Sequence, residues 1–180
     1  ILEQSVKAED LITKIFDAPQ NTPTPIDAYF AGVYYIGPIN AGFRGTASAV
    51  EYYQALYDEI EERRINGLMP ITPEGEMKEE RIRLVVEGPP NWTNFREFWK
   101  LFYDMGAVVV ASSYTKVGGV YDLGFRHDPE KPLESLATYC MNCYTNLNLS
   151  QRIDLLEKCI KKYKADGFLI NSIKSCNSFS

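Results

Sequence analysis

The clearest pattern in the sequence is RIRLVVEGPPNWTNFREFWKLFYDMGAVVVASSYTKVGG, residues 81–119. Residues 81–87 have the apolar, β-branched composition of a strand, and a Gly-Pro-Pro turn ends it. Residues 94–105 carry aromatic side chains at helical spacing, and the apolar run 107–111 is typical of a strand covered on both faces. In a strand–helix–strand unit the two strands pair in parallel, and the helix forms a right-handed crossover between them.

The residues that follow extend this pattern. We expect helices at 133–144 and 150–163, the second capped by Ser150, and a third short, buried strand at 168–170. We therefore predict an α/β fold, in which a parallel, Rossmann-like sheet flanked by helices occupies residues 81–180.

Residues 1–80 are predicted to form a mainly helical segment. Apolar residues recur at helical spacing over 2–16 and in a second helix, which Ser48 and Glu51 begin as a capping box. The apolar and aromatic segment 26–36 is expected to be buried, and the Gly-Pro pair after it to end it. The chain starts without Met and stops soon after the third strand, so we expect a fragment of a larger, multi-domain subunit.

The composition excludes several classes of protein. The chain has 180 residues, of which 45% are apolar and 24% charged, with a formal net charge of -5, which is typical of a globular protein. The acidic excess argues against a nucleic-acid partner. We find no apolar run of the roughly 20 residues that cross a bilayer and no secretory signal, so we expect no membrane partner and a cytoplasmic location.

Polar loops follow the three predicted strands, at 88–94, 112–119 and 171–178. Loops are often polar, but ligands of open parallel sheets bind beyond the carboxyl ends of the strands, and three adjacent loops share this property. We therefore expect a binding site at this edge, with Tyr114 and Tyr121 as candidates for ligand contact. The chain lacks a G-x-G-x-x-G or Walker lysine motif, so binding of nicotinamide or P-loop nucleotides is unsupported.

The cysteines lie at 140, 143, 159 and 176. Cys140 and Cys143 fit a thiol-redox pair or half of a zinc site, although they come late in a predicted helix. Cys159 is expected in the core. Cys176 follows a strand, so it is a candidate nucleophile or a metal ligand that needs partners from elsewhere. The lone histidine, His127, is expected in a surface turn.

The sequence resembles the 2-hydroxyacyl-CoA dehydratase and benzoyl-CoA reductase family in three runs: VVEGPPNWTNFREFWKLFYDMGAVVVASSYTKVGGVYD (85–122), YCMNCYTNLNLSQRIDLL (139–156) and KADGFLINSIKSCNSFS (164–180). In that family a subunit binds a [4Fe-4S] cluster through three cysteines, the third in a loop after an Asp-Gly strand. Cys176 matches this third position. The two upstream ligands have no counterpart here, because no cysteine precedes Cys140.

The resemblance implies an oxidoreductase subunit that takes part in the ATP-driven, two-electron dearomatisation of benzoyl-CoA to a cyclohexadiene thioester in anaerobic aromatic degradation. The Cys140–Cys143 pair favours this reductase branch. The implied partners are a second homologous cluster-binding subunit and an ATP-hydrolysing activator that donates electrons, and the isolated fragment is expected to be inactive. The implied acyl-CoA contacts are Asn91, Trp92, Ser113, Tyr114, Asn146 and Asn171.

Three other functions stay open at this point. The first is radical dehydration by a 2-hydroxyacyl-CoA dehydratase subunit, within the same family. The second is a non-catalytic α/β module that binds an acyl-CoA or a partner. The third is a thiol-redox domain that uses Cys140 and Cys143.

Overall fold

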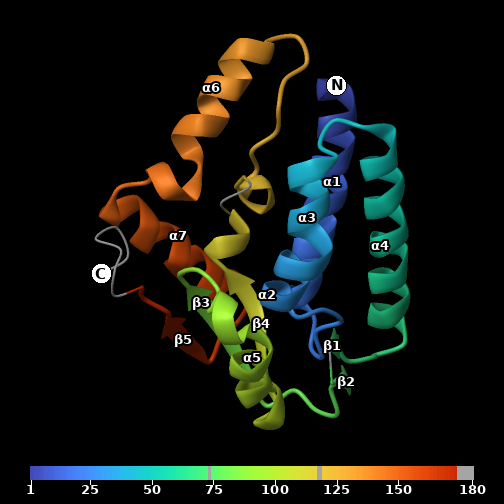
Figure 1. Ribbon diagram of the computed structural model, residues 1–180, viewed down its shortest axis with the longest axis vertical. Helices are drawn as coiled ribbons and strands as arrows, with labels where there is room; N and C mark the ends of the chain where they lie inside the picture. The colour runs from blue at the N-terminus through green and yellow to red at the C-terminus, as the bar shows by residue number, and fades with distance from the viewer. Residues whose placement is uncertain (73, 117–118, 174–180) are drawn as a thin grey trace.

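A three-stranded parallel sheet forms the centre of the computed structural model, which describes residues 1–72, 74–116 and 119–173. The strands are β3 (Ile82–Glu87), β4 (Ala107–Ser112) and β5 (Gly167–Ile170), in the order β4-β3-β5 (Figure 1). Both pairs of neighbouring strands are parallel. The predicted α/β fold with its parallel sheet flanked by helices is therefore confirmed.

The strands differ in how deeply they are buried. Every residue of β4 is buried, as its run of valines predicts for a strand covered on both faces. The expectation that β5 is buried is wrong, because Phe168 is 41% exposed and Ile170 is 65% exposed. Both β4 and β5 lie at margins of the sheet in the described part of the chain, but α2 (Ala28–Ala31) and α5 (Phe95–Asp104) pack against β4, whereas Phe168 and Ile170 of β5 face solvent.

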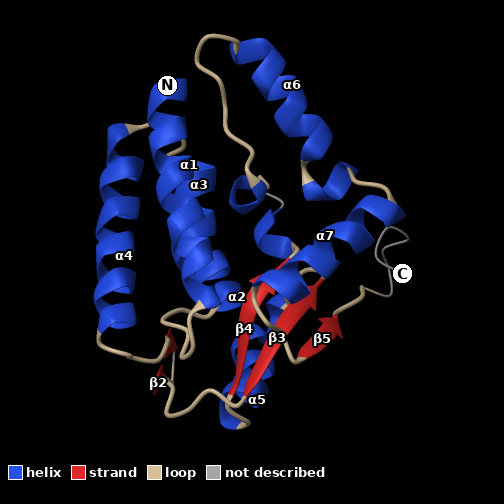
Figure 2. Cartoon of the chain, turned by 180° about the vertical axis from the view of Figure 1, so that it is seen from behind, coloured by secondary structure: helices blue, strands red, loops and turns tan. Residues whose placement is uncertain are grey.

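Helices cover both faces of the sheet (Figure 2). On one face α5 (Phe95–Asp104) buries Phe95 and Trp99 against Val86 and Val109. On the opposite face α7 (Leu149–Lys162) buries Leu155 and Cys159 against Val85 and Val108. Successive residues of β3 thus point to opposite helical layers, as the pleat of a strand requires.

Two features of the last helices refine the expectations. Cys159 is buried, as predicted for a core residue. Asn148 caps α7 in place of the predicted Ser150, through a capping box in which Asn148 and Gln151 bond each other's backbone amide at 3.0 Å. Helix α6 (Pro132–Asn142) stands apart from the sheet and carries mostly exposed side chains (Figure 1).

The first eighty residues fold mainly into helices. Helix α1 (Leu2–Asp17) packs along α4 (Ala47–Ile65), and a short antiparallel pair, β1 (Ile71–Thr72) and β2 (Gly75–Glu76), follows. Thr46, and not Ser48, caps α4, because its hydroxyl accepts a hydrogen bond from Ala49 N at 3.2 Å.

The apolar segment after residue 26 is helical. Helix α2 (Ala28–Ala31) runs into a π-helical turn (Gly32–Ile36) and then into α3 (Gly37–Gly42). The Gly-Pro pair therefore does not end the segment: it lies directly after the π-helical turn, where the N–H of Gly37 bonds to Gly32 O five residues back. Most of α2 and both ends of the π-helical turn are buried, but Tyr34 is 45% exposed.

Buried polar side chains join this segment to the sheet. The Asp27 carboxylate accepts hydrogen bonds from Tyr29 N and Phe30 N at 3.0 and 2.8 Å, and from Val109 N of β4 at 2.8 Å. Burial raises the pKa of Asp27 to about 6, against the lowering effect of these bonds. The division of the chain into a helical part, 1–80, and an α/β part, 81–180, stays a prediction. No helix in the described residues has the length and apolarity to span a membrane.

Candidate functional site at the carboxyl edge of the sheet

The loops that follow the three strands meet at one edge of the sheet. Gly88 N donates to Ser113 Oγ at 3.1 Å, which joins the loop after β3 to the loop after β4. Asn171 Nδ2 donates to Pro89 O at 2.6 Å, which joins the loop after β5 to the same turn. The parallel pairing thus brings together segments that are far apart in the sequence, as expected for the ligand-binding edge of an α/β sheet.

Gly88 lies where two of these loops approach most closely. Its φ is +99°, a backbone conformation that residues with a side chain rarely adopt. A Cβ at this position would lie 2.1 Å from Asn171 O, well inside contact distance. The absent side chain therefore allows the ends of β3 and β5 to close against each other.

Aromatic side chains frame the edge on its outer side. The rings of Trp92 and Tyr114 lie 5.8 Å apart, edge to face, and Trp92 is 61% exposed. The neighbouring Asn91 is exposed and accepts a bond from Thr93 Oγ1 at 3.1 Å. The structure thus brings five of the six expected contact residues to one edge: Asn91, Trp92, Ser113, Tyr114 and Asn171.

The sixth, Asn146, has a different local role. It lies in the 3-10 turn after α6, and its amide donates to Cys140 O at 2.5 Å, which caps the end of that helix. Tyr121, a further candidate, is buried at 3% exposure and packs into the helical core near Arg44. Tyr121 therefore does not face the sheet edge.

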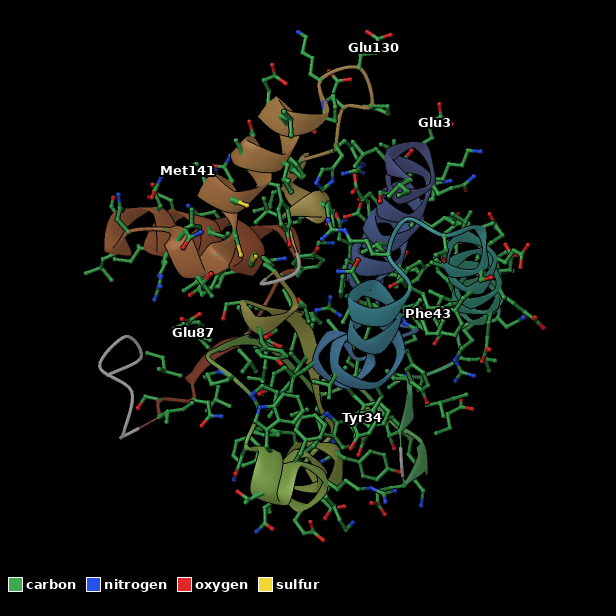
Figure 3. The ribbon with its side chains drawn as sticks, turned by 45° about the horizontal axis from the view of Figure 1, so that its top comes forward. Glu3, Tyr34, Phe43, Glu87, Glu130 and Met141 are labelled. Atoms are coloured by element: carbon green, nitrogen blue, oxygen red, sulfur yellow. The ribbon has the colours of Figure 1, made fainter. Side chains whose placement is uncertain are left out.

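Buried polar atoms line the same edge beneath these loops. Tyr144, 1% exposed, lies close to the Glu87 carboxylate and the Ser113 hydroxyl, and burial, followed by Glu87, raises the pKa of its hydroxyl. Glu87 ends β3 (Figure 3). Among the described residues, Tyr144 Oη, Glu87 Oε2 and, on the other face, Tyr29 Oη have no partner at hydrogen-bonding geometry.

Such unpaired buried groups are uncommon, because burial without a hydrogen bond costs on the order of 1–3 kcal/mol. Glu87 and Tyr144 lie beside each other at the end of β3, and Tyr29 lies near Asn171 on the other face, so buried polar groups reach this edge from both faces of the sheet. Glu87 and Tyr144 were not among the residues expected from the sequence, since neither belongs to a readable motif.

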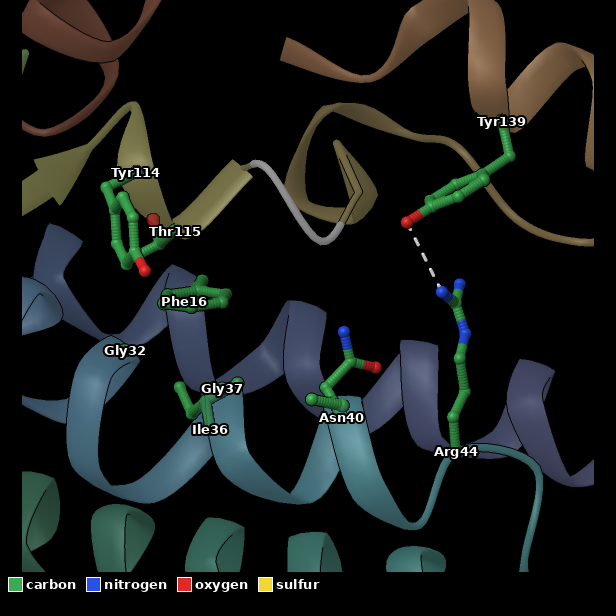
Figure 4. Close-up of a pocket in the computed structure, with 10 residues that line it drawn as sticks. Phe16, Gly32, Ile36, Gly37, Asn40, Arg44, Tyr114, Thr115 and Tyr139 are labelled. Atoms are coloured by element: carbon green, nitrogen blue, oxygen red, sulfur yellow. Dashed lines mark hydrogen bonds between the residues drawn. The ribbon is translucent and has the colours of Figure 1, made fainter. Parts of the chain in front are cut away.

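A cavity of about 430 Å³ opens beside this edge, between the π-helical turn, α3, the loop after β4 and α6 (Figure 4). Tyr114 and Thr115 border its end nearest the sheet, and Asn40, Arg44 and Tyr139 border its opposite end. Arg44 donates to the Tyr139 hydroxyl at 3.3 Å across this opposite end. The remaining lining residues are apolar or glycine: Phe16, Gly32, Ile36, Gly37 and Ala41.

Two glycines shape the wall of the cavity. A Cβ on Gly32 would lie 2.3 Å from Thr115 Cγ2, and a Cβ on Gly37 would lie 2.8 Å from Gly32 O. The π-helical turn between them therefore packs tightly on the loop that leaves β4. Single π-helical turns inside helices are frequent at functional sites. Two glycines five residues apart in an apolar segment were the one sign of this wall in the sequence.

The expected surface position of His127 is wrong. His127 is 5% exposed, its backbone N donates to Glu9 Oε2 at 3.0 Å, and its Nδ1 lies 2.5 Å from Glu9 Oε1. The imidazole also contacts the Tyr139 ring, at 5.3 Å between centroids. The partner carboxylate comes from α1, more than a hundred residues away, so the local turn-like sequence carried no sign of it.

The described cysteines do not form a metal site. Cys140 is exposed and Cys143 half-buried at the C-terminal end of α6, the opposite end of the helix from the one that thioredoxin-type pairs occupy. Over 1–72, 74–116 and 119–173, no three His, Cys, Asp or Glu side chains gather as a metal ion requires. Cys176, the expected cluster ligand, lies outside the described residues.

Comparison with known proteins gives two matches. Residues 1–180 match the family described as 2-hydroxyglutaryl-CoA dehydratase, D-component. The chain is also 69% identical over 179 residues to a subunit of the benzoyl-CoA reductase of Thauera aromatica. This match covers 99% of the chain but 41% of the relative, so the chain spans about two fifths of that relative's length.

Proposed function

Because the chain belongs to the 2-hydroxyglutaryl-CoA dehydratase, D-component, family, we propose that it is part of a larger subunit that reduces an aromatic acyl-CoA. The reaction is the ATP-driven, two-electron dearomatisation of benzoyl-CoA to a cyclohexadiene thioester. The observation that carries this proposal is the 69% identity to a benzoyl-CoA reductase subunit over almost the whole chain. In this proposal the enzyme is an oxidoreductase of anaerobic aromatic degradation, located in the cytoplasm.

The edge of the sheet supplies the surroundings for the acyl group in this proposal. Trp92 and Tyr114 offer aromatic faces that suit a planar ring. Ser113 and Asn171 offer polar groups that hold the surrounding loops together at 3.1 and 2.6 Å. These residues orient the substrate and exclude water, which is the part of the work that a protein does around a redox cofactor.

A [4Fe-4S] cluster, when bound in the full-length subunit, would supply single low-potential electrons. The resemblance to the family assigns it to Cys176 together with two cysteines upstream in the full polypeptide, and the described residues hold no ligand set of their own. No step of the reaction is assigned to the described cysteines. The proposed partners are a second homologous cluster-binding subunit and an ATP-hydrolysing activator that donates the electrons.

The cluster assignment is tested on the full-length subunit, reconstituted with iron and sulfide without oxygen. We expect Cys176→Ser to lower the bound iron and the brown absorbance, because clusters are held by cysteine thiolates. Cys140→Ser is the matched control, since Cys140 is exposed at a helix end and is expected to leave both readouts unchanged. Unchanged iron in Cys176→Ser would overturn the assignment.

A second function has its own support, because the matching family is named after a 2-hydroxyacyl-CoA dehydratase. In that case one recycled electron would assist the loss of water from a 2-hydroxyacyl-CoA. The reconstituted complex, supplied with activator and ATP, is offered benzoyl-CoA and 2-hydroxyglutaryl-CoA in parallel. Dearomatisation supports the reductase, dehydration supports the dehydratase, and turnover of neither leaves a non-catalytic acyl-CoA-binding module.

A further inference from the structure

The cavity beside the sheet edge changes in chemistry from one end to the other. Tyr114 and Thr115 border the end at the sheet, glycine and alkyl groups form the middle, and the side chains of Asn40 and Arg44 lie at the far end (Figure 4). At about 1.5 Å of rise per residue, the helical wall from Gly32 to Gly42 is roughly 15 Å long. The cavity therefore has the form of a slot that leads away from the reactive edge.

The far end of the slot is positively charged. Burial alone would lower the pKa of Arg44, but Tyr121, Tyr139 and Glu9 raise it, so the guanidinium keeps its charge. Glu9 lies 3.8 Å from Arg44 and is 3% exposed, because the buried His127 covers it. None of the described residues that line the cavity is acidic. The side chain of Arg44 itself is 30% exposed, so the charge that a ligand would meet is positive.

This order of groups matches a CoA thioester from its acyl end outward. The acyl group is followed by a neutral arm that carries amides, and the arm is followed by phosphates. We propose that the cavity is the slot for the CoA part of the substrate, with the arm along the π-helical turn and α3 and a phosphate at Arg44. This inference rests on the proposed function, since the acyl end is placed at the Tyr114 edge.

The geometry gives each lining residue a definite part. The wall at Gly32 and Gly37 is packed tightly, so the arm would lie in the open part of the cavity beside Ile36, Asn40 and Ala41. The Asn40 amide can bond to an amide of the arm, and a guanidinium binds phosphate through charge-assisted hydrogen bonds. Tyr121 and Tyr139, which accept hydrogen bonds from Arg44, hold the guanidinium in place.

The test measures the binding of CoA, pantetheine and inorganic pyrophosphate to the full-length subunit by calorimetry. We expect Arg44→Gln to weaken CoA binding at least tenfold, the effect of losing one charge-assisted contact, and to change pantetheine binding by less than about twofold. Ala41→Phe, which narrows the slot without changing its charge, should weaken both ligands. Arg64→Gln is the matched control, because Arg64 lies on the outer side of α4 and pairs with Glu61.

The results separate the possible errors. CoA affinity equal to wild type in both Arg44→Gln and Ala41→Phe would overturn the slot, even if the wild-type complex reduces benzoyl-CoA. If Arg44→Gln does not fold, the CoA and pantetheine affinities of Ala41→Phe alone decide whether the slot exists. A further outcome is that pyrophosphate binds as tightly as CoA while Ala41→Phe leaves the CoA affinity unchanged. That result would show only an anion site at Arg44 and would also overturn the slot. In the last case the wild-type subunit binds CoA, and both variants weaken this binding, while the complex turns over neither acyl-CoA. That result would support the slot and reject the proposed reaction.

Discussion

Replacing Gly88 with alanine tests how the loops meet at the sheet edge. The new Cβ would lie 2.1 Å from Asn171 O, where contacts under 3.0 Å are essentially never seen, so the backbone after β3 or β5 must move. The φ of +99° adds backbone strain of about 1–3 kcal/mol for any residue with a side chain. Overpacking adds about 1–3 kcal/mol, so we expect Gly88→Ala to lower the free energy of unfolding by roughly 2–6 kcal/mol.

Gly124→Ala provides a matched control. Gly124 has a φ of +104°, almost equal to that of Gly88, but nothing lies within 4 Å of its would-be Cβ. Gly124→Ala therefore has the backbone strain without the clash, and we expect a loss of about 1–3 kcal/mol. Urea unfolding of the two variants isolates the contact with Asn171, because the strain is common to both. Equal losses in the two variants would refute the close approach of the β3 and β5 ends.

Three more predictions follow from buried groups. Burial raises the native pKa of Asp27 from 3.8 to about 6, so the native state binds this proton more tightly than the unfolded state. The resulting stability is lost as the pH rises, by about 3 kcal/mol in total between a pH well below 3.8 and one well above 6. Urea unfolding of Asp27→Asn across this range should lack this pH dependence. Tyr53→Phe should lower the free energy of unfolding by about 1 kcal/mol, measured by thermal denaturation, because it loses the 2.8 Å hydrogen bond from Tyr53 Oη to Ile36 O. Gly32→Ala should destabilise the protein by about 1–3 kcal/mol, because the new Cβ meets Thr115 Cγ2. Adding Thr115→Ala should therefore restore most of that loss in the double variant. Additive losses of the two substitutions in urea unfolding would contradict this contact.

Local periodicity was enough to predict most of the elements. The aromatic stripe of α5 and the valines of β4 indicated a helix and a covered strand, and both formed close to the expected residues. The helix caps were each displaced by two residues, to Thr46 and Asn148, because several residues able to cap lie side by side at these positions. Propensity alone does not choose between such neighbours.

The predictions from the sequence that were wrong concern features that depend on contacts between distant segments. The exposure of β5 depends on which helices cover each margin of the sheet, and the periodicity of the sequence does not reveal this. His127 became buried through Glu9, and the cavity is assembled from α1, the π-helical turn, α3, the loop after β4 and α6. The sheet edge could be anticipated because topology places all carboxyl ends of parallel strands together, whereas no single segment carries the pattern of the cavity.

The pairing of β5 with β3 sets where Asn171 lies at the edge of the sheet. Leu84 lies opposite Gly167 and Glu87 opposite Ile170, so four pairs of residues set this alignment. Sliding β5 by one step would displace Asn171 by about 3.3 Å and turn each side chain of the strand to the other face. Asn171 opposes such a slide twice, since its N donates to Glu87 O at 2.8 Å and its amide to Pro89 O at 2.6 Å. The position of Asn171 at the edge of the sheet is therefore fixed by main-chain alignment together with its own side chain.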